Sequence, residues 1–317
     1  MTRSLENILT AGVQKKAFTL EALNLEINTF PYHRVDVNHP QRVQKASSGV
    51  NISATCSETW TLLRLLPLLL SKVIKEGQAK TDFHEEFTVL VLLIDLVQHI
   101  MADEFSQSSV SKLVTAVKQW LTLFHRVFPD FQMTPKFHNL VHYPSQVRKH
   151  GPLKKYSAIR YEAKHSEMKQ YLANSKNRMN PCKSMAEAHQ LASALRLSSS
   201  KQSEVQTEKH LGEYELVGYK VGDCISVKCA NDNVKLIEIT ELSSDSSKAH
   251  EAVAVVRGVT FANVELDNNL MAFRVSKEEP AIARLEDLFH FHPMGLYNIN
   301  DVKYVVPQFN GQLEPIT

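Results

Sequence analysis

The sequence predicts an α+β protein in which an N-terminal helical bundle is followed by a small antiparallel β-barrel domain. Apolar residues recur at helical spacing between Ser53 and Val127, and short runs rich in Val and Ile follow Leu211. The 317 residues, 43% hydrophobic and 22% charged, have an ordinary globular composition. The length suits two or three domains. We therefore divide the chain into an N-terminal arm and connector (1–52), a helical domain (53–197), a linker (198–210) and a barrel-like domain (211–317).

The first half of the chain is predicted to be helical. The arm is weakly patterned and is expected to form one short helix, Phe18–Phe30, before a polar connector that ends near Gly49. Ser57-Glu58-Thr59-Trp60 opens an apolar stretch that is typical of a buried helix with a kink at Pro67. The three bundle helices are expected at Leu62–Ile74, Phe87–Ile100 and Ser111–Val127.

Three more helices and a short strand are expected before the linker. A helix should start at Thr134-Pro135 and continue to about Lys149, because proline suits the first helical turn and Gly151-Pro152 follows. We expect a strand at Lys155–Ile159 and a helix at Tyr161–Asn174. A further helix, Ser184–Leu197, would begin with a capping box from Ser184 to Glu187.

The last third of the chain is predicted to be all β. A serine-rich stretch, 198–203, is typical of a linker. Seven short β-rich runs follow it, separated by Gly, Asn, Asp and Ser turns. These runs are Glu213–Tyr219, Asp223–Lys228, Val234–Thr240, Ala252–Val259, Met271–Val275, Leu285–Phe289 and Val302–Val306. We expect them to close into a small barrel.

Membrane spans, a secretory signal and a disulfide framework are not expected. The apolar runs Leu65–Leu70 and Val89–Ile94 are far shorter than the about 20 residues that a bilayer requires. The first residues lack the apolar core of a signal peptide. Four sparse, irregularly spaced cysteines indicate free thiols in a reducing compartment, so an intracellular location is expected, and a nuclear one if the protein binds DNA. The cysteines are Cys56, Cys182, Cys224 and Cys229.

Positive charge is concentrated between Lys136 and Lys183. This segment holds eleven Lys and Arg against two Glu, a net charge of +9, while the whole chain carries +2 and the remainder therefore −7. Clustered cations displace counterions from a phosphate backbone and so favour nucleic-acid contact. The alternative is a solvated surface on which lysine stems cover the bundle. The DNA-binding candidates are Lys154, Lys155, Arg160, Lys164, Lys169, Lys176 and Arg178.

Several motifs in this region resemble the C-terminal part of cut-and-paste DNA transposases of the CACTA-like (EnSpm) group in animals. They occur in the order expected of that group: His138–Pro144, Gly151–Leu153, Arg160–Ser166, Cys182–Ser184 and His189-Gln190. Phe18–Leu20, Thr29–Tyr32, Ser57–Leu70 and the tail from Leu285 to Pro307 are similar to the same group. The resemblance covers most of the chain, and it extends distantly to the catalytic core of the V(D)J recombinase.

The resemblance implies that Glu162 is the third acid of an Asp-Asp-Glu site for metal-dependent DNA strand cleavage and transfer. In such sites two Mg²⁺ ions about 4 Å apart stabilise the attacking and leaving oxygens, and carboxylates hold them. The two aspartates should lie on strands of a ribonuclease-H-like sheet, and residues 1–132 contain no such pattern. We therefore expect a remnant of a transposase that does not catalyse by itself. Alternatively, Glu162 forms a structural salt bridge with Arg160 or Lys164.

The same resemblance implies a zinc pair at His138 and His142. Their i, i+4 spacing would place both on one face of a helix. Zinc needs four ligands, and the CxxC that the family would supply is absent, because Cys224 and Cys229 are separated by four residues. The alternative is that the two histidines form hydrogen bonds within a core.

Three functions follow from these observations. The first is a transposon-derived, DNA-associated protein that follows phosphate without reading sequence. The second is a protein-interaction module in which the barrel binds a partner and the basic helices are only a surface. The third, a metal-dependent hydrolase using His138, His142 and Glu162, lacks further acids. The sequence leaves the oligomeric state open.

Overall fold

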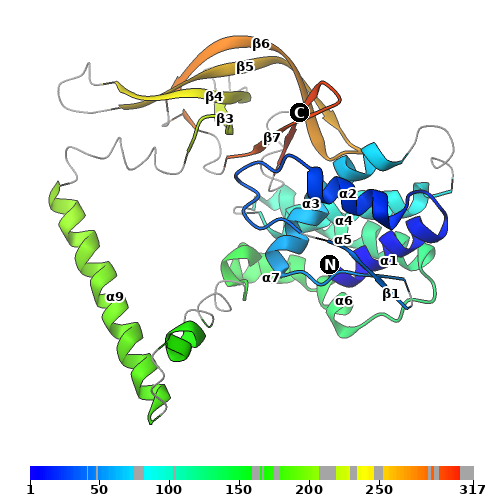
Figure 1. The fold of residues 1–317 in the computed structure, drawn as a ribbon, viewed down its shortest axis with the longest axis horizontal. Coiled ribbons are helices and arrows are strands. Elements are labelled where there is room, and N and C mark those ends of the chain that lie inside the picture. The colour runs from blue at the N-terminus through cyan, green and yellow to red at the C-terminus, as the bar shows by residue number, and fades with distance from the viewer. Residues whose placement is uncertain are drawn as a thin grey trace.

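The structure is a computed structural model in which helices and an antiparallel sheet pack on one another (Figure 1). It describes residues 1–40, 42–47, 49–74, 82–102, 105–158, 165, 168–174, 179–206, 219–228, 234–245, 253–284, 287–288 and 293–307. The helices are α1 (Thr2–Gln14), α2 (Leu20–Thr29), α3 (Cys56–Val73), α4 (His84–Ile100), α5 (Gln107–Val127), α6 (Pro135–Leu140), α7 (Tyr143–His150), the 3-10 helix η1 (Leu153–Tyr156) and α9 (Pro181–Gln206). The strands are β1 (Gln44–Ala46), β2 (Gly49–Asn51), β3 (Cys224–Lys228), β4 (Val234–Asp245), β5 (Val253–Asp267), β6 (Ala272–Arg284), β7 (Gly295–Ile299) and β8 (Val302–Val306).

Helices α2 to α5 confirm the predicted helices of the first half, with slightly different ends. Helix α3 starts earlier than predicted because Thr55 caps it: the Thr55 side chain accepts from the backbone of Glu58 at 3.3 Å, and the Glu58 carboxylate accepts from the backbone of Thr55 at 2.6 Å. The Thr55 backbone bond and then its side-chain bond lower the pKa of Glu58. Pro67 lies inside α3 and is buried.

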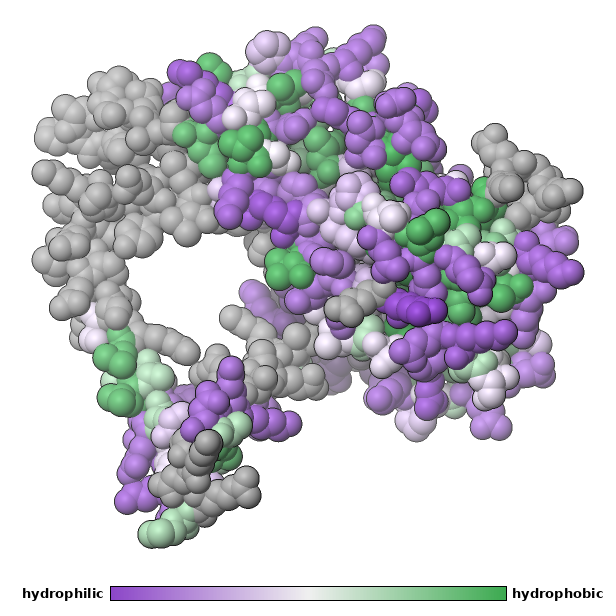
Figure 2. Space-filling model, viewed as in Figure 1, coloured by the Kyte–Doolittle hydropathy of each residue, from purple (hydrophilic) through white to green (hydrophobic). Residues whose placement is uncertain are grey.

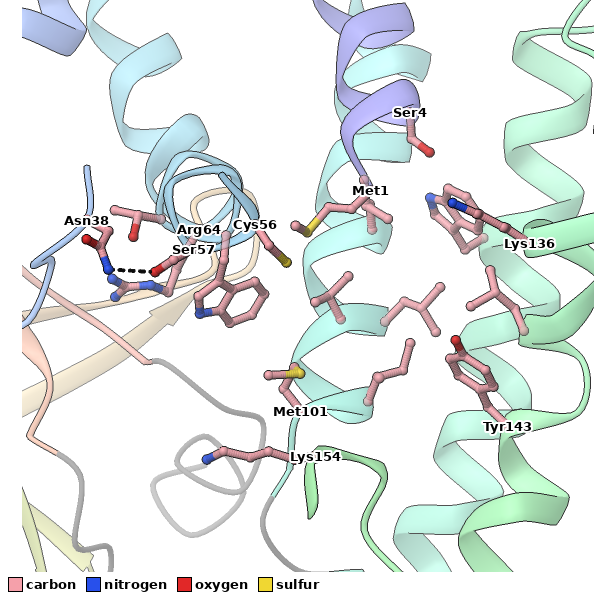
Figure 3. A pocket seen from close by; sticks show the side chains of 18 of the residues that line it. Met1, Ser4, Asn38, Cys56, Ser57, Arg64, Met101, Lys136, Tyr143 and Lys154 are labelled. Carbon is pink, nitrogen blue, oxygen red and sulfur yellow. Dashed lines mark hydrogen bonds between the residues drawn. The ribbon is translucent and has the colours of Figure 1, made fainter. Parts of the chain in front are cut away.

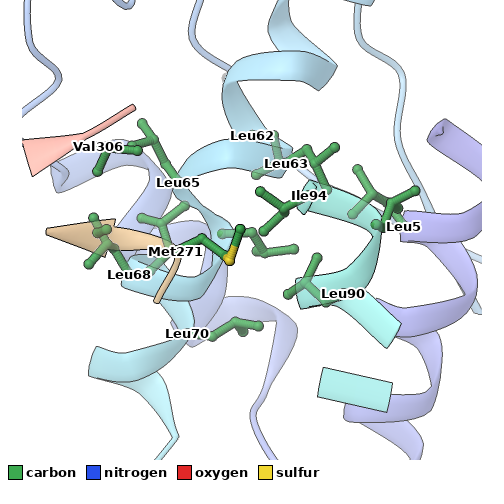
Figure 4. Close-up of a cluster of buried hydrophobic side chains, with 14 of the residues drawn as sticks. Leu5, Leu62, Leu63, Leu65, Leu68, Leu70, Leu90, Ile94, Met271 and Val306 are labelled. Atoms are coloured by element: carbon green, nitrogen blue, oxygen red, sulfur yellow. The ribbon is translucent and has the colours of Figure 1, made fainter. Parts of the chain in front are cut away.

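Helix α3 lies at the centre of the core, because it is buried on both of its sides. In Figure 4, Leu62 and Leu63 lie towards Leu5 of α1 and Ile94 of α4. Leu65 and Leu68 lie on the other side, towards Met271 and Val306 of the sheet region. A single cluster of buried apolar side chains therefore extends from the helices into the sheet. This two-sided burial explains why the sequence of α3 is a nearly continuous apolar run rather than an amphipathic stripe.

Helix α1 and strands β1 and β2 of the N-terminal arm were not predicted from the sequence. Helix α1 buries Leu5, Ile8, Leu9 and Gly12, a helical spacing that was present in the sequence. Strands β1 and β2 form a short hairpin, in which the backbone N–H of Val50 donates to the hydroxyl of Thr10 at 2.9 Å. The residues described within 1–132 contain no strands other than these two.

Three predictions for the segment from Thr134 to Leu197 were wrong in detail. The single helix expected up to Lys149 is two helices, α6 and α7, because Pro144 cannot donate a backbone hydrogen bond and disfavours helical geometry in the residue before it. Residues 153–156 form η1 rather than the start of a strand. Helix α9 begins at Pro181, where Asn180 accepts from the backbone of Lys183, so Ser184 lies inside the helix and does not cap it.

The β region is an open six-stranded antiparallel sheet, so the predicted barrel was wrong. Its strand order is β3-β4-β5-β6-β8-β7. Strands β4, β5 and β6 have 12, 15 and 13 residues, whereas β3, β7 and β8 have five each. The short strands flank only part of the long ribbon, and a barrel requires pairing along every strand. Next to the sheet's edges, isolated bridges join Cys224 to Met294 and Val227 to Leu288.

Five of the predicted strands are confirmed, three of them with longer ends, and one strand of the sheet was missed. Strands β3 and β8 lie at their predicted positions, β4, β5 and β6 extend well beyond their predicted ends, and β7 was not predicted. Most of the run expected at Glu213–Tyr219 lies outside the described residues, as does most of Leu285–Phe289.

Helix α9 extends away from the other helices and the sheet (Figure 1). Leu191, Leu195 and Leu197 on it are more than half exposed. Elsewhere on the face seen in Figure 2, hydrophobic and hydrophilic residues are intermingled. None of the described helices is long and apolar enough to cross a membrane, as expected.

Candidate nucleic-acid interface

The candidate interface is built on α6, α7 and η1, which follow one another around two tight changes of direction. Phe137 fixes the short helix α6, because its ring stacks on Trp120 of α5 with centroids 5.7 Å apart. Val147 fixes α7 through burial in the core cluster. Gly151 ends α7 with φ +79°, a backbone conformation that favours glycine. These anchors leave the charged side chains Lys136, Arg148, Lys149 and Lys155 exposed.

Basic side chains gather on these three elements, and we call this group the basic surface. Its members are Lys136, Arg148, Lys149, Lys154 and Lys155. All are exposed except Lys154, which is half-buried. The Tyr156 hydroxyl donates to the carbonyl of His150 at 2.7 Å and so holds the end of η1 against the end of α7. Arg148 and Lys149 are thereby brought near Lys154 and Lys155.

Four exposed members of the basic surface form no ion pair with acidic side chains within the part of the chain that the structure describes. No ion pair of Lys136, Arg148, Lys149 or Lys155 occurs there. By contrast, Lys183 at the start of α9 pairs with Glu187 at 3.7 Å. Arg148 and Lys149 lie in the last turn of α7, where cations also interact favourably with the helix dipole. The exposed cations are thus placed to meet an external anion.

Only some of the predicted DNA-binding residues can be located. Lys154 and Lys155 lie on η1, and Lys169 is exposed within the helical residues 168–174. Arg160, Lys164, Lys176 and Arg178 lie outside the described residues, and so does Glu162, the predicted third acid.

His138 and His142 converge despite the break between α6 and α7. Their Nε2 atoms are 3.2 Å apart and their ring centroids 4.9 Å apart, at an interplanar angle of 80°. Both side chains are exposed, so the alternative of a core hydrogen bond does not describe them. His138 is in the last turn of α6 and His142 precedes α7. One ring donates and the other accepts, and the tautomers decide which ring is the donor.

As a metal site, this pair supplies two nitrogen ligands. The described residues contain no group of three or more His, Cys, Asp or Glu side chains that could hold a metal ion. Cys56 and Cys182 are exposed free thiols, and Cys224 is buried in β3. Burial, followed by the charges of Glu238 and Asp223, raises the pKa of Cys224 and keeps it protonated. The described residues therefore do not complete the four-ligand zinc site that the resemblance implies.

A buried charge network joins the helices to the sheet, and sequence reasoning missed it. Asp36 accepts hydrogen bonds from Arg64 of α3 and, at 2.5 Å, from the hydroxyl of Tyr297 in β7. Arg34 pairs with Asp223, which is fully buried just before β3. Burial raises the pKa of Tyr297, opposed by the charge of Arg64 and reinforced by that of Asp36. No local sequence pattern indicated this network, because the partners of Arg34 and Asp36 lie far away along the chain.

Fold and site together define the class as an α+β protein with an open antiparallel sheet, a continuous helix–sheet core and an exposed basic surface at a helical junction. Comparison of the chain with family models, with curated proteins and with solved structures finds no match.

Proposed function

We propose that the protein associates with duplex DNA through the basic surface, which would contact phosphate groups without reading base sequence. The observation that carries the proposal is the group of exposed cations on α6, α7 and η1 that lack acidic partners among the described residues. Cations that pair with no acid in the protein need not break an ion pair when they bind phosphate. Each such contact also releases condensed counterions from DNA. Phosphate contacts of this kind position a protein and carry no sequence information directly.

Descent from a CACTA-like transposase is part of the proposal and rests on the ordered motifs between His138 and Gln190. Because transposases act on DNA, this descent favours DNA over RNA as the nucleic acid that the basic surface binds. Strand cleavage by this chain is not proposed, because residues 1–132 lack the sequence pattern of the sheet that would carry the two aspartates.

The proposal is tested by measuring DNA binding as a function of salt. Fluorescence anisotropy with a labelled duplex of arbitrary sequence should show affinity falling steeply between about 50 and 200 mM salt, with a log–log slope of about −0.9 per phosphate contact. A second, unrelated duplex should bind about equally well. An absence of binding at the lowest salt would reject the proposal and leave the basic helices as a solvated surface.

Charge reversal identifies the surface that binds. The triple variant Arg148→Glu, Lys149→Glu, Lys155→Glu should weaken binding to both duplexes and make the salt slope less negative by about 0.9 for each phosphate that is no longer bound. The matched control reverses Lys45, Lys228 and Lys235, which are exposed on β1, β3 and β4 and change the net charge equally. Equal losses of affinity in the two triple variants would show that net charge, and not the basic surface, determines affinity.

A further inference from the structure

A cavity of about 730 Å³ lies where α3, α4, α5 and α6 meet, and the function proposed above does not use it. Its walls are mostly apolar. We call one of them the α4 wall, because it consists of four aliphatic side chains on one face of that helix: Leu93, Leu96, Val97 and Ile100. Trp60 and Trp120, the two tryptophans of the chain, also line the cavity. Its volume is within the range of about 300–1,000 Å³ that is usual for small-molecule sites, so it can hold the apolar part of a small ligand.

The cationic groups of the lining lie on two sides that differ in charge compensation. Figure 3 shows Arg64 of α3 on one side and Ser4 and Lys136 on the opposite side. The guanidinium of Arg64 already pairs with the buried carboxylate of Asp36. Lys136 is exposed and forms no ion pair within the described part of the chain. The side of the cavity that contains Lys136 therefore has a positive charge that no acid of the described residues compensates.

Two buried hydrogen-bond donors without acceptors lie on the same side as Lys136. Trp120 belongs to this side because its ring stacks on that of Phe137, the residue after Lys136, with centroids 5.7 Å apart. Trp120 is 2% exposed and Ser4 is fully buried, and neither Nε1 of Trp120 nor the Ser4 hydroxyl has a hydrogen-bond partner among the residues that the structure describes. Buried polar groups of this kind normally have partners. Because the described lining contains no Asp or Glu, this side favours a ligand that brings its own negative, acceptor-rich end.

We propose that this cavity binds an amphiphilic anion, whose carboxylate or phosphate head pairs with Lys136 and whose apolar tail lies along the α4 wall. Because Lys136 is exposed, the head group stays partly in water and avoids the cost of complete desolvation. Burial of the tail provides the main favourable free energy. The site is distinct from the one proposed for DNA: the α4 wall is not part of the basic surface, although Lys136 and Lys154 contribute to both.

Intrinsic fluorescence of the full chain tests the proposal directly, because both tryptophans line the cavity. Octanoate and octyl phosphate are titrated into the millimolar range, beside octyltrimethylammonium, which has the same tail and the opposite charge, and acetate, which lacks the tail. At least one of the two amphiphilic anions should change the fluorescence saturably and bind about fivefold or more tightly than the cation. Response to octanoate alone identifies carboxylate as the head group, and response to octyl phosphate alone identifies phosphate. Absence of saturable binding by both anions, or equally tight binding of the cation or of acetate, would overturn the proposal.

Two variants assign the head and the tail of the ligand to their contacts. Val97→Phe places a ring in the space for the tail and should weaken anion binding about tenfold, whereas Val114→Phe, at a position that is 42% exposed on α5 and outside the lining, should leave it unchanged. Lys136→Met keeps the apolar stem and removes the charge, so it should weaken anion binding about fivefold and leave binding of neutral octan-1-ol unchanged.

Lys136→Met changes an exposed residue, so it provides the test if Val97→Phe fails to fold. Unchanged anion affinity in Lys136→Met, or in folded Val97→Phe, would overturn the proposal. Because none of these titrations contains DNA, their failure is distinguishable from failure of DNA binding.

Discussion

Two regions of the molecule differ in the burial and the pairing of their charged side chains. Where α3 meets the sheet, Asp36, Arg64 and Asp223 are almost fully buried, and each charge has a partner of opposite sign. On α6, α7 and η1 the cations other than Lys154 are exposed, and Lys136 and Arg148 have no acidic partner among the described residues. Removing charges from water is costly, so buried charges must be paired, whereas exposed cations stay solvated until a ligand arrives. The first region therefore determines stability, and the second is available for binding.

Removing a buried partner should have the largest effect on stability. Asp36→Ala leaves the Arg64 guanidinium without its carboxylate in the core, and we expect a decrease of about 3–5 kcal/mol in the free energy of unfolding. Denaturant titration followed by circular dichroism measures this decrease. The matched control is Glu241→Ala, which breaks the exposed pair with Arg257 (3.4 Å) and should cost no more than about 1 kcal/mol. Similar decreases in the two variants would contradict the distinction between the regions.

Truncating a leucine in the core region and one on the exposed helix α9 extends the comparison from charge to apolar burial. Leu68 is fully buried between the helices and the sheet, and Leu68→Ala should lower stability by roughly 2–5 kcal/mol, because removing its methyl groups leaves a cavity in the core. Leu191 on α9 is 64% exposed, and Leu191→Ala should change stability by no more than about 0.5 kcal/mol. Thermal unfolding of both variants measures the difference. A large destabilisation by Leu191→Ala would show that α9 packs against something in solution.

Removing the Glu58 carboxylate from the cap of α3 should have the smallest effect on stability, and this effect should depend on pH. The pKa of Glu58 is lowered in the folded state, so its contribution is present above the unfolded pKa and is lost as pH falls through the folded pKa. Glu58→Gln should therefore cost up to about 1 kcal/mol at neutral pH. The two proteins should become equally stable well below about pH 4. Unfolding curves at both pH values provide the check, and a difference that persists in acid would exclude the carboxylate as its cause.

Much of the helical half could be predicted from the sequence because its signals are local. The apolar period placed α4 and α5 close to their observed positions, and the alternation of strand residues placed β8 at Val302–Val306. Local signals were also overlooked: the spacing of Leu5, Ile8 and Leu9 indicated α1, and Pro144 indicated the break after α6. For the candidate site, the cluster of basic residues was visible in the sequence, whereas the close approach of His138 and His142 required the turn between two helices.

The sequence by itself determined where charge is concentrated and where the main helices form, since both depend on residues within a few turns of one another. Tertiary structure alone decided that the sheet stays open, that Asp36 meets Tyr297 across 261 residues, and that both tryptophans line one cavity. These features depend on strand pairing and on burial between elements distant in the chain, and neither leaves a periodic pattern in the local sequence.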